Sequence, residues 1–142
     1  MPGNVSNDIR DDELSHRVIG CALKVHRTIG SGLLESAYEA CLVYELAKAG
    51  FKVARQVALP IIYEEVRVDV GYRPDLIVNA ELMVELKTVA QLLPVHDAQL
   101  LTYLRLSGIE RGLIINFHAH PVSKGIKRMV LSRTSRGSVV PQ

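Results

Sequence analysis

The chain has 142 residues, of which 48% are hydrophobic and 23% charged, a composition typical of one globular domain and not of a disordered or fibrous protein. No apolar run approaches the ~20 residues of a membrane-spanning helix, and the polar, acidic start lacks the features of a secretory signal. We therefore expect a cytoplasmic protein without a membrane association. A net charge of +2 does not by itself indicate a nucleic-acid-binding protein.

Hydrophobic periodicity divides the chain into helices and strands. Apolar residues at helical spacing predict helices over residues 14–29 and 33–49, and Pro94 and Gly108 bound a third helix. Alternating or short apolar runs predict strands over residues 51–59, 66–70, 76–78, 82–88, 112–117 and 126–131. Helices and strands in this order predict an α/β protein with a mixed central sheet flanked by helices.

The same patterns predict three parts of the chain. Residues 1–13 form a polar N-terminal segment, residues 14–131 form the domain, and residues 132–142 form a flexible C-terminal tail. Cys21 and Cys41 lie in apolar helical stretches without a CxxC motif, so we expect buried, reduced thiols. Five basic residues near the C-terminus are more typical of a solvated face or tail than of a phosphate-binding track: Lys124, Lys127, Arg128, Arg133 and Arg136.

One group of charged residues falls on predicted strands. Glu85 and Lys87 are two residues apart on one strand, so their side chains share a face. Asp75 begins the preceding strand, and a three-residue turn at 79–81 places it directly opposite Glu85. A turn with an even number of residues would shift the register by one and put Asp75 on the wrong face.

Two converging carboxylates suit a hard divalent cation such as Mg²⁺ or Mn²⁺. A lysine beside the cation can orient a water molecule or stabilise developing phosphate charge, which is the arrangement of metal-assisted phosphodiester hydrolysis. The alternative is a surface ion pair on a half-exposed strand, and spacing alone favours this alternative.

The wider context of these motifs resembles the PD-(D/E)XK nuclease superfamily. Pro74-Asp75 and Glu85-Leu86-Lys87 match the superfamily signature, followed as expected by a helix and an apolar strand. The segment GLLESAY at 32–38 is similar to the signature of the GxxExxY family, which is assigned to that superfamily. Further similar stretches are VHR at 25–27, HDAQLLTYL at 96–104 and LIINF at 113–117, so the resemblance covers about residues 14–130.

The resemblance implies a restriction-endonuclease-like fold and a defined site. Asp75, Glu85, Glu35 and the backbone carbonyl of Leu86 would bind the metal, and Lys87 would act with the three carboxylates in catalysis. A further set would contact the substrate or support the site: Gln99, Tyr103 and Tyr38. Each of these has a structural alternative: Glu35 favours the helix dipole, Tyr38 is a core-edge aromatic, and the other two pack a helix on the sheet.

The histidines give weaker signals. His26 on an amphipathic helix is best interpreted as a hydrogen-bonded structural residue, and His96 either caps the third helix or lies at a cleft mouth. His118 and His120 form an HxH pair without a clear third metal ligand, so we treat this pair as incidental.

Two functions compete at this point. The first is a metal-dependent nuclease or related phosphodiesterase acting on nucleic acid with Mg²⁺ or Mn²⁺. The second is a non-catalytic module that keeps the nuclease-like fold and binds nucleic acid or protein. The presence of all three of Asp75, Glu85 and Lys87 favours the first, and the weak net charge favours the second. Nothing in the sequence indicates a homo-oligomer.

Overall fold

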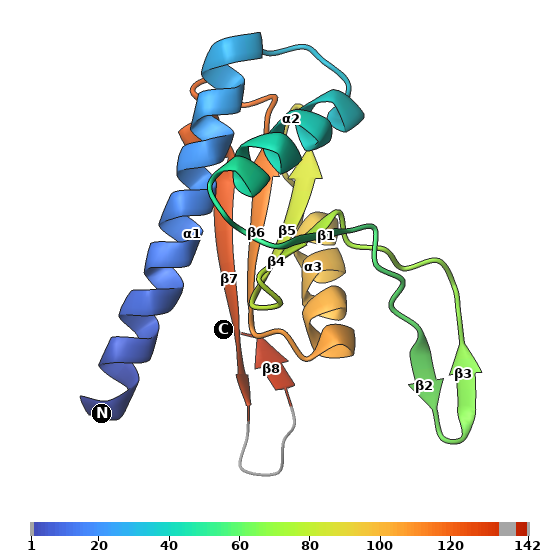
Figure 1. Cartoon of the computed structure of the whole chain (residues 1–142). Helices are drawn as coiled ribbons and strands as arrows, with labels where there is room; N and C mark the ends of the chain where they lie inside the picture. Colours follow the sequence, from blue (N-terminus) through green and yellow to red (C-terminus); the bar gives the residue numbers. More distant parts are fainter. Residues whose placement is uncertain (1, 134–138, 142) are drawn as a thin grey trace.

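The computed structural model describes the backbone of residues 2–133 and 139–141 and the side chains of residues 13–131. Three α-helices, eight strands and one 3₁₀ helix alternate along these residues (Figure 1). In chain order they are α1 (Pro2–Ile29), α2 (Glu35–Lys48), β1 (Val53–Arg55), β2 (Ile61–Tyr63), β3 (Val66–Val68), β4 (Leu76–Val78), β5 (Leu82–Lys87), α3 (Pro94–Ser107), β6 (Arg111–Asn116), η1 (Val122–Gly125), β7 (Ile126–Arg133) and β8 (Val139–Pro141).

The central sheet is mixed, as predicted. Its strand order is β1-β4-β5-β6-β7, and β8 extends it by pairing with the C-terminal end of β7. Strands β5 and β6 are parallel, and the other neighbours are antiparallel. The parallel pair forms the centre and is buried along almost its full length, which explains why β6 is apolar at residues 112–115, between Arg111 and Asn116.

Helices cover both faces of this sheet. Alternate residues of β5, such as Val84 and Leu86, point into a core shared with α1 and α2. The intervening residue Met83 joins the second core, under Leu100 and Leu104 of α3. The predicted mixed sheet flanked by helices is confirmed, and the layers agree with a restriction-endonuclease-like architecture.

Some predicted elements differ from the observed ones. Helix α1 begins at Pro2, twelve residues before the predicted start, and so includes residues 2–13 of the predicted polar segment. The predicted strand 51–59 is reduced to β1 because Gln56 adopts a positive φ of 50°, which ends the extended run. Residues 139–141, expected in a loose tail, form β8, whereas residues 134–138 and 142 lie outside the described residues.

Strands β2 and β3 form a separate two-stranded hairpin between β1 and β4. We call residues 61–70 the arm, because it projects away from the body of the protein (Figure 1). A two-residue loop at Glu64-Glu65 connects the strands, and Glu64 has a positive φ of 53°. Glu64 and Glu65 give no sequence signal for a hairpin turn, since such turns favour glycine and asparagine.

Two remaining predictions concern the cysteines and the membrane. Cys21 and Cys41 are free thiols, as predicted, but both are half-buried where burial was expected. Burial raises the pKa of the Cys21 thiol, with a smaller contribution from Glu45. A search of the described helices finds no segment with the length and hydropathy needed to cross a bilayer.

Candidate functional site

Asp75 and Glu85 meet across the β4–β5 hairpin. The register pairs Val78 with Leu82 and Leu76 with Val84, so the next pair outward is Asp75 and Glu85, as the three-residue turn predicts. The backbone N–H of Asp75 donates to Oε1 of Glu85 at 2.7 Å. In return the N–H of Leu86 donates to Oδ2 of Asp75 at 2.7 Å. Both carboxylates are buried.

The turn that sets this register has a clear local cause. Asn79 and Ala80 both have positive φ, 54° and 56°, and Glu81 donates its N–H to the carbonyl of Val78 at 3.0 Å. Asparagine tolerates this left-handed conformation better than most residues. The Asn79 side chain also accepts from the N–H of Lys52 at 2.9 Å, which ties the turn to the start of β1.

Burial controls the charge of the two carboxylates. Desolvation, followed by the negative charge of Asp75, raises the pKa of Glu85 from 4.5 to about 8. Desolvation also raises the pKa of Asp75, although its hydrogen bonds from Leu86 and Gln56 act in the opposite direction. A nearby cation would make it easier for Asp75 and Glu85 to be ionised together. Lys87 lowers the pKa of both acids, but less than burial raises it.

Lys87 is held beside the pair by residues of α3. Its Nζ donates to Oε1 of Gln99 at 2.9 Å and lies 4.0 Å from Oε2 of Glu85. Gln99 in turn donates from Nε2 to the hydroxyl of Tyr103 at 3.1 Å. The structure therefore links Gln99 and Tyr103, one helical turn apart, to the lysine in a continuous chain of hydrogen bonds.

An open hollow of about 210 Å³ lies next to this chain of hydrogen bonds. Gln99 and Tyr103 line it together with Tyr72, whose ring meets that of Tyr103 edge to face at 5.9 Å. Burial, followed by the charge of Glu85, raises the pKa of the Tyr103 hydroxyl. Space for a bound molecule therefore lies beside Gln99, the residue that holds the amine of Lys87.

Glu35 approaches the same group from the first turn of α2. It is half-buried, and its pKa is raised mainly by desolvation, then by the charge of Asp75, while Lys87 lowers it. Glu35 in turn raises the pKa of Glu85. Its carboxylate is therefore close enough to interact electrostatically with Asp75 and Glu85. Its place in the first turn of α2 also suits a negative charge, because the helix dipole stabilises one there.

Three residues absent from the predicted site form a hydrogen-bond network that reaches Asp75 through Gln56. Gln56 donates from one nitrogen, Nε2, to Oδ1 of Asp75 and to Oε1 of Glu39, both at 3.1 Å. Arg55 donates to Oε2 of buried Glu39 from Nε at 3.2 Å and from Nη2 at 3.1 Å. The sequence spacing of these residues could not predict this network, because Glu39, Gln56 and Asp75 lie in three separate segments that meet only in the folded chain.

Asn116 also supports the site and was not predicted. It lies beside Lys87 in the parallel β5–β6 register and is buried. Its side chain donates to the carbonyl of Val89 at 2.8 Å and accepts the Val89 N–H at 3.1 Å. This pair of bonds fixes the chain as it leaves β5 just after the lysine.

Tyr38 lies apart from the charged group. It is fully buried, stacks on Phe117 with ring centroids 4.4 Å apart, and donates its hydroxyl to the carbonyl of Gly30 at 2.7 Å. The hydroxyl also accepts the N–H of Leu33 at 3.3 Å. These contacts correspond to the structural alternative, in which Tyr38 organises the turn between α1 and α2.

The histidines take structural positions where their contacts are described. His96 accepts the N–H of Leu93 on Nδ1 at 2.9 Å and so caps α3. His26 is buried with its ring 6.3 Å from that of Phe117 and 6.0 Å from that of His120. Its Nε2 has no hydrogen-bond partner among the described residues, so the expected hydrogen bond at that atom is missing.

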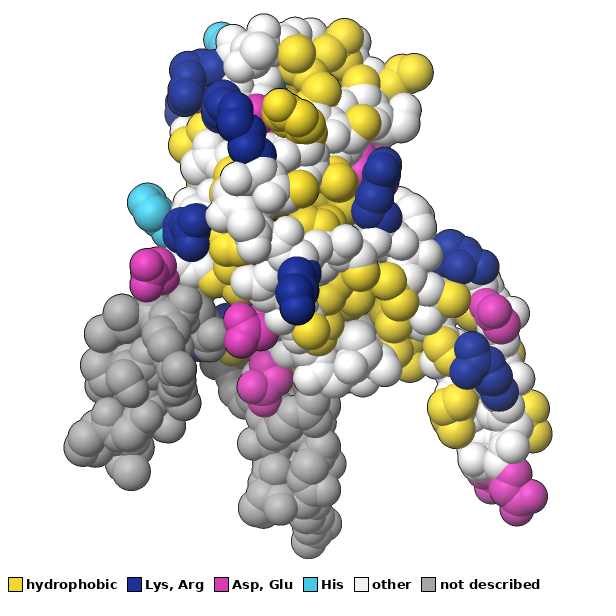
Figure 2. Space-filling model, viewed as in Figure 1, with side chains coloured by type: hydrophobic (Ala, Val, Ile, Leu, Met, Phe, Trp, Pro, Cys, Tyr) yellow, Lys and Arg dark blue, Asp and Glu magenta, His cyan; other side chains and the backbone are white. Residues whose placement is uncertain are grey.

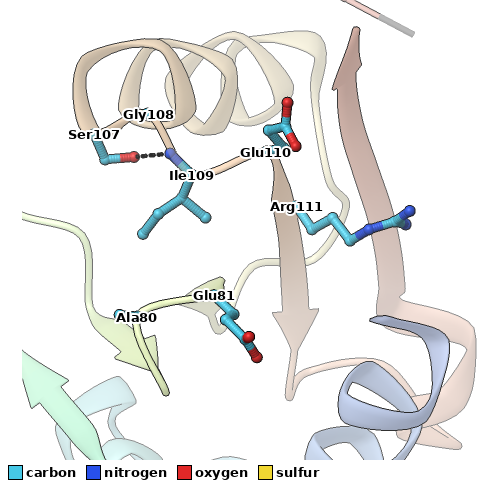
Figure 3. A pocket seen from close by; sticks show the side chains of 7 residues that line it. All are labelled: Ala80, Glu81, Ser107, Gly108, Ile109, Glu110 and Arg111. Carbon is cyan, nitrogen blue, oxygen red and sulfur yellow. Dashed lines mark hydrogen bonds between the residues drawn. The ribbon is translucent and has the colours of Figure 1, made fainter. Parts of the chain in front are cut away.

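A larger open hollow, about 360 Å³, lies at the other end of the sheet (Figure 3). The β4–β5 turn and the loop from α3 into β6 line it, including Glu81, Ser107 and Arg111. Because Arg111 pairs with Leu82 at the start of β5, this hollow is about 17 Å from Lys87 along the strand. It contains none of the predicted site residues.

The described residues contain no group of three or more His, Cys, Asp or Glu side chains arranged to hold a metal ion. The donor set at Asp75 and Glu85 nevertheless fits a hard cation, because Mg²⁺ commonly uses only one or two carboxylates together with water and substrate oxygens. The raised pKa of Glu85 points the same way, since a cation would stabilise the ionised pair.

A mixed sheet with an Asp at one strand start and Glu-x-Lys on its hairpin partner defines a class of nuclease-like domains. The chain belongs to the PD-(D/E)XK nuclease superfamily, whose family profile matches residues 12–129. Members of this superfamily typically use divalent metals. Neither a curated protein nor a solved structure matches the chain significantly.

Proposed function

We propose that this protein is a nuclease that hydrolyses phosphodiester bonds of nucleic acid with Mg²⁺ or Mn²⁺. The observation that carries the proposal is the buried pair of Asp75 and Glu85, in which the backbone N–H of Asp75 donates to Oε1 of Glu85 at 2.7 Å and Nζ of Lys87 lies 4.0 Å from Oε2 of Glu85. A purely structural ion pair would have one acid for one base, whereas here two acids share one lysine.

Asp75, Glu85 and the backbone carbonyl of Leu86 would hold the cation, with Glu35 as a further carboxylate from α2. A bound cation would supply Lewis acidity and lower the pKa of a water molecule. A bound cation would lower the raised pKa of Glu85 and so favour its ionised form, while the surrounding apolar core excludes bulk water from one side.

Lys87 carries the catalytic role in this proposal. Its Nζ donates to Oε1 of Gln99 at 2.9 Å and lies 4.0 Å from Oε2 of Glu85. The ammonium group is therefore held near the carboxylates without forming a short ion pair. From that position it can donate to a phosphate oxygen or orient the attacking water. The hollow between Tyr72 and α3 can accept the adjoining part of the substrate.

The motif at 32–38 supports placing the chain in the GxxExxY family within the superfamily. In this structure the glutamate of that motif, Glu35, lies near the charged group, and its tyrosine, Tyr38, braces the preceding turn. The motif therefore combines one residue of the proposed site with one that positions the helix carrying it.

The test is cleavage of a panel of single- and double-stranded DNA and RNA with Mg²⁺ or Mn²⁺. Cleavage should require Asp75, Glu85 and Lys87, and Lys87→Ala should spare metal binding because lysine is not a ligand. Glu81→Ala, on the exposed β4–β5 turn, is the matched control. Binding without turnover across the panel would instead favour a non-catalytic binding module.

A further inference from the structure

The arm presents an unpaired strand edge. Among the described residues β3 pairs only with β2, so the outer side of β3 has no strand neighbour. A two-stranded hairpin is marginally stable on its own, and three or more strands with an apolar face are normally needed. The arm has such a face, because Ile61, Tyr63, Val66 and Val68 fall on one side in the observed register.

The arm is apolar but not basic, which limits what it can bind. Tyr63, Val66 and Val70 are each more than half exposed. The arm carries Glu64, Glu65 and Asp69 against a single Arg67, and Figure 2 shows acidic side chains at its tip. A net negative, apolar hairpin is unsuited to a phosphate backbone and suited to another protein strand.

The sequence of the free edge is complementary to itself. Residues 66–70 read Val-Arg-Val-Asp-Val. If this segment pairs antiparallel with a second copy about Val68, Arg67 lies opposite Asp69 of the second copy, and the same contact repeats on the other side. Val66 then lies opposite Val70 of the second copy. Oppositely charged and β-branched cross-strand pairs both stabilise a sheet.

The backbone pattern agrees with this register. Two-residue hairpin loops are closed by a hydrogen-bonded pair, so Tyr63–Val66 and Ile61–Val68 direct their backbone groups to each other. The backbone groups of Arg67 then point to the open edge. β3 ends at Val68, and the same alternation would direct those of Asp69 to this edge when pairing extends the strand by one residue. These are the residues that would exchange hydrogen bonds with the second copy.

The two edges of the arm are not equivalent. Pro60 precedes β2 and has no N–H to donate at that edge, whereas β3 contains no proline. The Asp69 side chain is also held in position, because its Oδ1 accepts the N–H of Gly71 at 3.2 Å. These features select β3 over β2 as the pairing edge.

We propose that two copies of this chain associate through β3, forming a continuous four-stranded sheet in the order β2-β3-β3-β2 across a two-fold axis at Val68. Each copy contributes a short segment, so the dimer is weak, with a dissociation constant on the order of micromolar. The association is independent of the nuclease site and holds whether or not the protein cleaves nucleic acid.

The first test is sedimentation of the full chain with charge-swap variants. Wild-type protein should show a concentration-dependent dimer. Arg67→Asp or Asp69→Arg alone places like charges opposite each other twice and should weaken the dimer about tenfold or more. The double swap should restore it, and an equimolar mixture of the two single variants should form a heterodimer. A wild-type monomer at about 0.5 mM would overturn the proposal.

The second test locates the two-fold axis. In the proposed dimer Val68 lies opposite Val68 of the second copy, in a pair that exchanges no backbone hydrogen bonds. The Cα atoms of such a pair are about 4.5 Å apart, which permits a disulfide. Val68→Cys should therefore give a covalent dimer on mild oxidation, while Val66→Cys, opposite Val70, should not. Wild type under the same oxidant controls for Cys21 and Cys41. Equal cross-linking of both variants, or a dimer unaffected by the charge swaps, would refute β3 pairing.

Discussion

Asp75 and Glu85 are bound reciprocally through backbone amides: the N–H of Asp75 donates to Glu85, and the N–H beside Glu85, that of Leu86, donates to Asp75. Both bonds measure 2.7 Å, so the strand pairing orients each carboxylate independently of any ligand. Asn or Gln at either position keeps an oxygen for the same amide, which makes these substitutions clean tests of charge.

Glu85→Gln should change the pH dependence of stability. The pKa of Glu85 is about 8 in the folded protein against 4.5 in its ordinary state. Between these values only the folded protein holds the proton, so the free energy of unfolding of wild type falls as pH rises, by up to ~1.4 kcal/mol per pH unit. Below pH 4.5 the full contribution is present, and above about 8 it is lost.

Urea denaturation of both proteins from pH 5 to 8.5, with a chelator present, measures this effect. Glu85→Gln should gain stability relative to wild type as pH rises, on the order of a few kcal/mol over the range. Glu81→Gln removes the same charge from the exposed turn and should follow wild type. Parallel curves for wild type and Glu85→Gln would show that Glu85 is ionised throughout.

Divalent metal should stabilise wild type more than variants of the pair. Ligand that binds only the folded state at 100 times its dissociation constant adds about 2.7 kcal/mol to the free energy of unfolding. Asp75→Asn and Glu85→Gln remove ligand charge and should lose most of this gain, while Glu81→Gln keeps it. Thermal denaturation with and without Mg²⁺ or Mn²⁺ measures the shift, and equal shifts in all four proteins would place the cation elsewhere.

The chain of hydrogen bonds from Lys87 predicts a graded loss of activity. Lys87→Ala should reduce kcat by on the order of 10²–10³. Gln99→Ala removes the 2.9 Å contact to the amine and should reduce kcat about tenfold. Tyr103→Phe removes only the next bond and should cost less. Arg105→Ala, exposed on the same helix, is the control, and a Gln99→Ala enzyme with unchanged kcat would contradict the positioning role.

Tyr38→Phe should separate folding from chemistry. The substitution leaves the carbonyl of Gly30 and the N–H of Leu33 without their hydroxyl partner, at a cost of about 1–3 kcal/mol in the free energy of unfolding. The ring still stacks on Phe117, so the core stays filled. Metal-induced stabilisation should be unchanged, and a loss of metal response in this variant would place Tyr38 at the site.

The central residues of the candidate site could be predicted because their arrangement depends only on whether the turn between two strands has an odd or even number of residues. A strand repeat of two and an odd turn are sufficient to put Asp75 opposite Glu85, and helical spacing is sufficient to put Gln99 and Tyr103 on one face. Asn79 supplied a turn signal of the right kind. These relationships are local, so a single sequence contains them.

The unpredicted parts depend on contacts between distant segments or on unusual backbone. Glu39 and Gln56 are 17 residues apart and meet only once α2 packs on the sheet. The arm escaped prediction because Glu64 takes a positive φ that glycine or asparagine would normally signal. The helical start of α1 was missed because its first twelve residues are mostly polar, and Val5 and Ile9 alone are too few to establish an apolar periodicity.

Gln56 sets a narrow limit on substitution at its position. Its amide nitrogen donates to the carboxylate of Glu39 on α2 and to that of Asp75 just before β4, so it spaces the helix that carries Glu35 from the start of this strand. Glutamate would add a further negative charge beside Asp75 and Glu39. An aliphatic residue would remove the donor that Asp75 and Glu39 share, leaving Glu39 with Arg55 alone. Lysine would neutralise the charge a cation needs. The side chain at 56 therefore acts as a neutral spacer, and the separation between helix and strand depends on its length.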